Sequence, residues 1–156
     1  IDEVMATPVQ SLLDHLSDNW SHTAISYQNF NSVFDPQVTR TGFTNNDIYI
    51  VPRVELVDSE WQNGIPQEQD TVVEFYNFEV QIVALSGTGL QNIEARIANL
   101  KTLYDRTTVT NEGNTLRFRE FQALQGEQVG FSNINPDAVL FTTPTMTTFQ
   151  VARVDS

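Results

Sequence analysis

The stretch Ser86-Gly87-Thr88-Gly89 has the glycine content of a phosphate-binding loop. It lies between a run of strand periodicity and a run of helix periodicity, where a phosphate could bind the helix N-terminus. However, Asn92 stands where a dinucleotide-binding fingerprint has its third glycine, and no Gly-Lys-Ser/Thr follows as in a P-loop. We therefore interpret the stretch as a turn in which Ser86 or Thr88 caps the helix.

The two histidines, His15 and His22, are seven residues apart across a predicted helix end and do not form the paired ligands of a zinc site. The chain has no cysteine, which excludes disulfides, thiolate metal sites and a cysteine nucleophile. It also lacks the Gly-x-Ser-x-Gly elbow of a serine hydrolase. We expect a protein that is not an enzyme and has no catalytic residue, cofactor or metal.

Two pairs of carboxylates have the spacing that puts both on one side of an extended segment: Asp58 with Glu60, and Glu68 with Asp70. Such pairs could hold Ca²⁺, but the glycine of the required turn and a later bidentate Glu are absent. We interpret them as solvated charge on a projecting loop.

Arg117 and Arg119 are predicted to lie on one side of a strand in an otherwise acidic protein. Two interpretations are open. The arginines could neutralise neighbouring carboxylates of the same chain, or they could form salt bridges to an acidic surface of another subunit.

These residues must be positioned by the elements around the centre of the chain. From Val72 to Ala84 every second side chain is apolar with one exception, which predicts a long strand with one face in a core. From Leu90 to Tyr104 the apolar residues recur in steps of three and four, which predicts an amphipathic helix. We expect this helix to fold back across the apolar face of the sheet.

The first half of the chain supplies further elements. Patterning predicts a helix from about Asp2 to Asn19, with Pro8 in its first turn or at its start, and a short strand over Ala24–Asn29. A loop over Asn31–Asn46 carries Phe34 and Phe43. A strand with an irregularity at Pro52 follows over Asp47–Val57, and the polar stretch Asp58–Asp70 then projects as an arm or loop.

The second half is predicted to be mostly strand. Thr107–Phe121 has the pattern of a hairpin turned at Asn111–Asn114, and Gln122–Asp137 has loop composition. Val139–Val154 is predicted to be a closing strand, or a strand pair interrupted near Pro144. The order predicts a single α+β domain over residues 1–156, with a mostly antiparallel sheet and two helices packed on one face.

Composition narrows the classes of function. The 156 residues suit one domain, and twenty acidic against eight basic residues give a formal charge of −12. That balance argues against a general nucleic-acid-binding surface, which relies on clustered Lys and Arg. No apolar run reaches the length of a membrane span, and the first residues lack the pattern of a signal peptide, so we expect a soluble protein.

Taken together, the segments resemble the tail terminator, or tail-completion, proteins of long-tailed bacteriophages. The resemblance rests on the order and spacing of elements over nearly the whole chain: the N-terminal helix ending in Trp20, the stretch Ala24–Phe30 leading to Phe34-Asp35-Pro36, the strands Asp47–Val57 and Val72–Ala84, Gly87-Thr88-Gly89 with its following helix, and a closing strand after Arg117 and Arg119.

The resemblance implies a virion protein, assembled in the host cytoplasm, that forms a hexameric ring. Such a ring stops growth of the tail tube and joins it to the head–tail connector, and DNA passes through its channel without specific binding. Negative charge around that channel would repel phosphate, so that DNA slides instead of binding.

By position, the subunit or tube contacts would fall on the predicted arm, with Trp61 and Ile65 as apolar anchors, and secondly on Phe34 and Phe43. Arg117 and Arg119 are further interface candidates, and Glu68 and Asp70 are the candidates for the channel face. Two alternatives remain open: another neck ring protein, such as a stopper or adaptor, and a non-viral α+β module that binds a small molecule.

Overall fold

The computed structural model describes residues 7–27, 48–61, 70–85, 90–124, 127–131 and 139–155. Within these ranges the chain forms two helices, α1 (Pro8–Asn19) and α3 (Leu90–Tyr104). It also forms eight strands: β1 (Ala24–Ile25), β2 (Ile48–Trp61), β3 (Asp70–Leu85), β4 (Thr108–Asn111), β5 (Asn114–Phe118), β6 (Gln122–Ala123), β7 (Glu127–Phe131) and β8 (Val139–Asp155).

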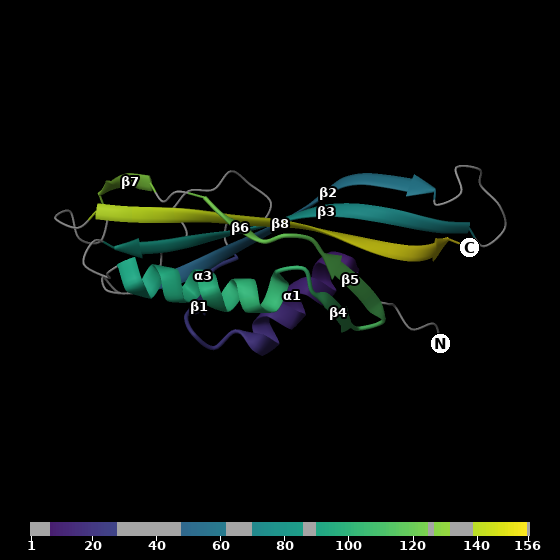
Figure 1. Ribbon diagram of the computed structural model, residues 1–156, viewed down its shortest axis with the longest axis horizontal. Helices are drawn as coiled ribbons and strands as arrows, with labels where there is room; N and C mark the ends of the chain where they lie inside the picture. The colour runs from purple at the N-terminus through teal and green to yellow at the C-terminus, as the bar shows by residue number, and fades with distance from the viewer. Residues whose placement is uncertain are drawn as a thin grey trace.

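All eight strands belong to one long, twisted sheet (Figure 1). Its strand order is β1-β2-β3-β8-β5-β4, and β6 and β7 pair with β8 beside β5. Every pairing is antiparallel except that of β1 with β2. The prediction of a mostly antiparallel α+β sheet is therefore confirmed.

β3 is the centre of the core, as its alternating sequence predicts. Five consecutive inward-facing side chains of this strand are buried: Tyr76, Phe78, Val80, Ile82 and Ala84. Directly paired residues of β2 and β8 add Ile50, Val54 and Phe149 to the same face. Since pairs on adjacent strands share a face, three long strands present one continuous apolar surface.

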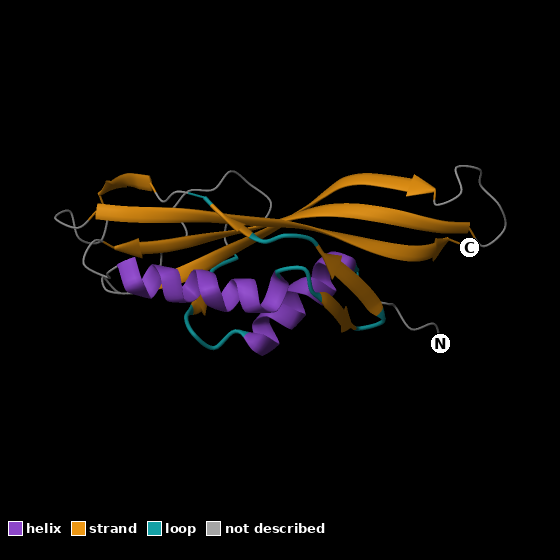
Figure 2. Ribbon diagram, viewed as in Figure 1, coloured by secondary structure: helices purple, strands orange, loops and turns teal. Residues whose placement is uncertain are grey.

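Helices α1 and α3 both cover that surface, and Figure 2 shows them on the same side of the sheet. Leu12 and Leu16 of α1, and Leu100 and Tyr104 of α3, have no solvent exposure. Tyr104 packs edge-on against Phe78, with 5.2 Å between the ring centroids. The predicted packing of two helices on one face is confirmed.

Neither of the described helices is long and apolar enough to cross a membrane.

The first helix begins later than predicted. Thr7 is its N-cap and accepts a hydrogen bond from the Gln10 amide at 3.1 Å, and Pro8 follows directly. Proline suits the first helical position because its missing N–H would have no partner there. Of the two interpretations given for Pro8, the one in which it marks the helix start is confirmed; residues 1–6 lie outside the described part.

The first strand is shorter than predicted. Only Ala24 and Ile25 pair with β2, in parallel, and the Ser26 amide adds one hydrogen bond of 2.9 Å to the Ile50 carbonyl. Tyr27 is not part of the strand, and the last two residues of the predicted strand, Gln28 and Asn29, lie outside the described part.

The irregularity of β2 lies at a different place from the one predicted. Pro52 pairs with Val80 without a break, whereas the register shifts between Leu56 and Asp58. Among the described residues β1 pairs only with Tyr49 and Ile50, so the outer side of β2 at Pro52 needs no N–H donor. A proline is tolerated at such an edge, and the bulge forms further along.

In the second half one prediction was wrong in part, and for the last segment the first of two alternatives, a single closing strand, is confirmed. Gln122–Asp137 is not all loop, because β6 and β7 pair along the edge of β8. β8 itself is one strand and is not interrupted at Pro144. Pro144 lies on β8 between the residues paired with β6 and those paired with β7, and its carbonyl accepts from the Leu124 amide at 2.8 Å. Pro144 has no backbone N–H, and between the two paired segments β8 does not need to donate a hydrogen bond from this residue.

The predicted hairpin is confirmed, with β4 and β5 joined by Glu112 and Gly113. Both have positive φ, 52° and 83°, as the two-residue turn of a hairpin requires. The hairpin is fixed to α1, because Asn111 donates to the Ser11 carbonyl at 3.0 Å and Asn114 donates to Ser11 Oγ at 2.8 Å.

Candidate functional site

One end of the sheet extends beyond the layer of helices. In Figure 1, β2, β3 and β8 continue past the helices and the β4–β5 hairpin as a three-stranded arm. The last part of β2, the first part of β3 and the last part of β8 form it, and Trp61 pairs with Val72 near its tip. The predicted arm is thus largely strand at its base, since Asp58–Trp61 belong to β2 and Asp70 begins β3.

The β2 strand of this arm is exposed along its whole outer part. Every residue from Glu55 to Glu60 is exposed, including Leu56 at 51% and Val57 at 57%. Leu56 pairs with Tyr76, which places it on the same face as the core, yet about half of its side chain is in solvent. Two adjacent apolar side chains in solvent mark a candidate contact surface.

The backbone of β2 contributes to the same surface. Beyond Ile50 the outer edge of β2 has no strand partner within the described ranges. Such an edge presents N–H and C=O groups that can pair with another chain. The bulge after Leu56 and the acidic side chains beside it limit uncontrolled pairing of this kind.

Half of the interface residues predicted from the sequence lie outside the described part. Ile65 and Glu68 belong to the undescribed range 62–69, and Phe34 and Phe43 belong to the undescribed range 28–47. The predicted turn Ser86–Gly89 also lies outside the described residues. The backbone of Trp61 and Asp70 is placed at the end of the arm, but their side chains are not described. Their roles stay predictions.

Arg117 and Arg119, in contrast, are described and both are exposed. Arg117 lies in β5 next to the buried Phe118, so its side chain is on the face of the sheet opposite the core. Arg119 follows the strand, and its amide donates to the Thr148 carbonyl at 2.9 Å. The predicted placement of both arginines on one side is confirmed.

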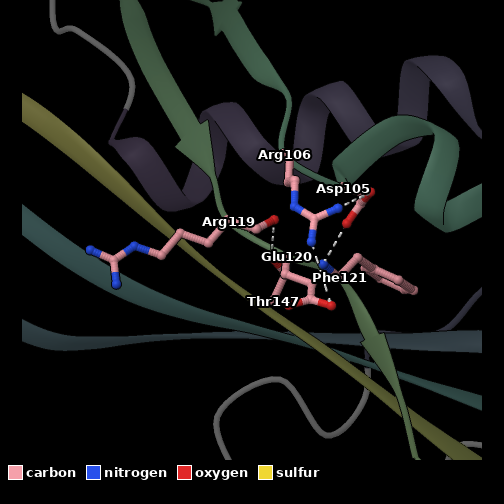
Figure 3. A network of polar contacts seen from close by, with 6 residues as sticks. All are labelled: Asp105, Arg106, Arg119, Glu120, Phe121 and Thr147. Carbon is pink, nitrogen blue, oxygen red and sulfur yellow. Dashed lines mark hydrogen bonds and ion pairs between the residues drawn. The ribbon is translucent and has the colours of Figure 1, made fainter.

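The nearby carboxylates are bound to another arginine. Figure 3 shows Arg106 between Asp105 and Glu120, at 3.7 Å and 3.6 Å, while the Arg119 side chain points away from this group. In the part of the chain that the structure describes, Arg117 and Arg119 form no ion pair. Neutralisation within the chain, the first interpretation of these arginines, therefore finds no support there.

The same network fixes the backbone that carries Arg119. Its carbonyl accepts from the Arg106 amide at 2.9 Å and from the Thr147 hydroxyl at 3.2 Å (Figure 3). Asp105 accepts from the Phe121 amide at 2.9 Å, which closes the corner between α3 and the chain after β5. Arg119 is thereby held on a rigid base with a free, exposed head group.

A group of titratable side chains lies between α1, α3 and the hairpin. His15 Nδ1 is 3.0 Å from the hydroxyl of Tyr104, which is fully buried. Burial lowers the pKa of His15, an effect that the negative charge of Asp18 opposes, and burial raises the pKa of Tyr104. Because Tyr104 is inaccessible to solvent, we interpret the pair as part of the core and not as reactive groups.

The hairpin turn adds a carboxylate to this group. A hydrogen bond to Asp14 raises the pKa of Glu112, and the charges of Asp14 and Asp18 act in the same direction. Burial raises the pKa of Tyr27, as does the charge of Asp14. The sequence did not predict this grouping, because it depends on a contact between α1 and a turn about a hundred residues later.

Among the described residues no three His, Asp or Glu side chains lie close enough together to hold a metal ion. The exposed apolar, acidic and basic side chains at the edges of the sheet are of the kinds that take part in contacts with a partner.

Comparison with known proteins identifies the fold but no function. No protein-family model matches the chain, and no curated protein matches it. One solved structure with the same fold, whose name contains no functional term, superposes with a TM-score of 0.59 and is 18% identical. The match covers 94% of this chain and 94% of that chain. At that identity the likeness extends to the fold alone.

Proposed function

We propose that this protein is a structural subunit of a tailed bacteriophage, a tail terminator that assembles into a hexameric ring and joins the tail tube to the head–tail connector. The proposal comes from the order and spacing of elements in the sequence. The α+β fold with a long antiparallel sheet and helices on one face is consistent with it.

The observation that supports it most is the arm. Three long strands extend past the helix layer, and the last part of β2, which enters this arm, carries the exposed pair Leu56 and Val57. A chain that only had to fold would gain nothing from exposing these side chains, whereas a subunit can bury them against a neighbour. The arm would then contact the next subunit or the tail tube.

The acidic composition has a role in such a ring. Each subunit brings a formal charge of −12, so six subunits around a channel create a strongly negative potential. DNA phosphates are repelled by it, which lets DNA pass without binding. The acidic side chains that face the channel would include the predicted pair Glu68 and Asp70.

Electron microscopy of the virus particles that contain this chain tests the proposal. Gold-labelled antibodies against the purified protein should bind at one position per particle, the junction between tail and head. Labelling along the tail, on the capsid surface or at the distal tail tip would assign the chain to another part of the particle, and absence of the chain from purified particles would overturn the proposal.

A further inference from the structure

The face of the sheet opposite the helices carries two charged rows. One row of directly paired residues crosses four strands: Asp58, Phe75, Gln150 and Arg117. The neighbouring row consists of Glu55, Asn77 and Thr148, and the Thr148 carbonyl binds the Arg119 amide. Each row begins with a carboxylate on β2 and ends with an arginine at β5.

These ends define two surfaces. The acidic edge consists of Glu55, Asp58 and Glu60, all of which are exposed and on the same face because they pair with Asn77, Phe75 and Val73. The basic edge consists of Arg117 and Arg119. The side chains between the two edges in these rows, those of β3 and β8, are uncharged.

The charges cannot neutralise one another within one molecule. The acidic edge and the basic edge are three strand spacings apart, about 14 Å, which exceeds the distance over which exposed charges interact at physiological salt. Arg53 pairs with Glu79 and lies on the same face as Glu55, two residues before it along β2, and the three carboxylates of the acidic edge outnumber it. Both edges are thus left with unbalanced charge among the described residues.

The basic edge is unusual in this chain. Of only eight basic residues, three meet at one corner of the sheet, where the Arg106 amide binds the Arg119 carbonyl. Arg106 is occupied by Asp105 and Glu120, which leaves Arg117 and Arg119 directed outward. An acidic surface would complement them, and the chain carries such a surface on its own opposite edge.

We propose that a second copy of this chain places its acidic edge against the basic edge of the first. This inference rests on the proposed ring and names the surfaces that join its subunits. The contact is head to tail, so each copy uses one edge of each sign, and repetition around an axis closes a ring. Val57, the exposed residue at the bulge beside Asp58, supplies apolar area to the same contact.

The contact is made by side chains. β4 lies outside β5, and Thr108 pairs with Arg117, so a neighbouring β2 cannot extend the ladder from β5 itself. Arginine suits such a contact because its planar head group binds carboxylates in bidentate fashion. Pairing of opposite charges also fixes which edges meet, since two acidic edges or two basic edges repel one another.

A charge-swap experiment tests the inference. The basic-edge variant, Arg117→Glu with Arg119→Glu, makes both edges acidic, and the acidic-edge variant, Glu55→Lys with Asp58→Lys, makes both edges basic. Each variant alone should associate about tenfold more weakly or not at all. An equal mixture of the two should recover the assembled mass, because alternating copies restore opposite charges at every contact.

Light scattering after size exclusion gives the mass, and a thermal melt of each variant checks folding. Lys101→Glu and Glu94→Lys, which reverse exposed charges on α3, are the matched controls and should assemble like the natural chain. A variant that carries all four edge substitutions in one chain provides a second test, since it should assemble with itself.

The outcomes separate this inference from the proposed function. If the natural chain forms rings and neither edge variant weakens them, the assigned surfaces are wrong and the ring stands. If the natural chain is a monomer at all concentrations tested, both proposals fail. If the basic-edge variant keeps its assembled mass but loses binding to a fluorescent DNA duplex that the natural chain binds, the arginines contact nucleic acid and the inference is overturned.

Discussion

At the scale of single residues, we expect His15 to make the stability of the fold depend on pH. Its ring is half-buried and hydrogen-bonded to the fully buried Tyr104, and burial holds its pKa below the usual 6.5. The unfolded chain therefore binds a proton more readily than the folded one, so stability falls as the pH drops through 6.5 toward the lowered pKa.

His15→Asn should reduce this pH dependence. We expect the melting temperature of the natural chain to fall between pH 7 and about pH 5.5, and that of the variant to fall less over the same interval. His22→Asn, at an exposed position, is the control and should keep the full dependence. Equal slopes for all three proteins would show that His15 does not carry the effect.

A second residue-scale prediction concerns the buried bond between Ser11 and Asn114. Ser11→Ala removes the hydroxyl that accepts from Asn114 at 2.8 Å, which leaves a buried amide N–H without that acceptor. We expect a loss of about 1–3 kcal/mol in the free energy of unfolding, measured by urea titration. Ser21→Ala, at an exposed position, should change it by less than about 0.5 kcal/mol.

At the scale of elements, α3 closes the core. Leu100 is fully buried within the hydrophobic cluster, whereas Ala98 is exposed on the same helix. Leu100→Asp places a charge in that cluster and should abolish cooperative unfolding, as followed by circular dichroism. Ala98→Asp introduces the same residue at the surface and should cost less than about 1 kcal/mol. A normal melt for Leu100→Asp would contradict the packing of α3 on the sheet.

The arm should serve assembly and not stability. Replacing the exposed Leu56 and Val57 by Ser should leave the melting temperature within a few degrees, because neither side chain is buried in the single chain. It should lower the assembled mass measured by light scattering, because apolar contact area is lost. Leu124→Ser, at another exposed leucine, should leave the mass unchanged.

The elements differ in how well their sequences predict them. α3 was predicted to the residue, because its apolar positions recur at helical spacing between clear boundaries. β6 and β7 were missed because polar residues such as Gln122 and Glu127 pair through their backbones along the edge of β8. Backbone pairing of an edge leaves little hydrophobic pattern in the sequence.

Pro144 shows the same limit, since its place on β8 between the segments that pair with β6 and with β7 is not revealed by any local pattern. The candidate surface was predicted in part: the exposed arginines follow from alternation along β5. The arginines lie at the opposite ends of the rows of paired residues that begin with Glu55 and Asp58. This arrangement depends on the register of four strands, which a single sequence does not specify.

At the scale of the whole molecule, one sheet separates three kinds of surface. Helices and core occupy one face, the acidic edge lies along β2, and the basic edge lies at β5. A subunit with opposite charges at its two edges is suited to head-to-tail contacts, and in the proposed ring its formal charge of −12 would make the channel negative.

The central claim, that this chain is a ring-forming subunit, is tested most directly by native mass spectrometry of the purified protein over a range of concentrations. The account predicts a closed assembly of six times the mass of one chain, with no series of larger or open forms. A monomer at every concentration, or an unlimited ladder of masses, would contradict it.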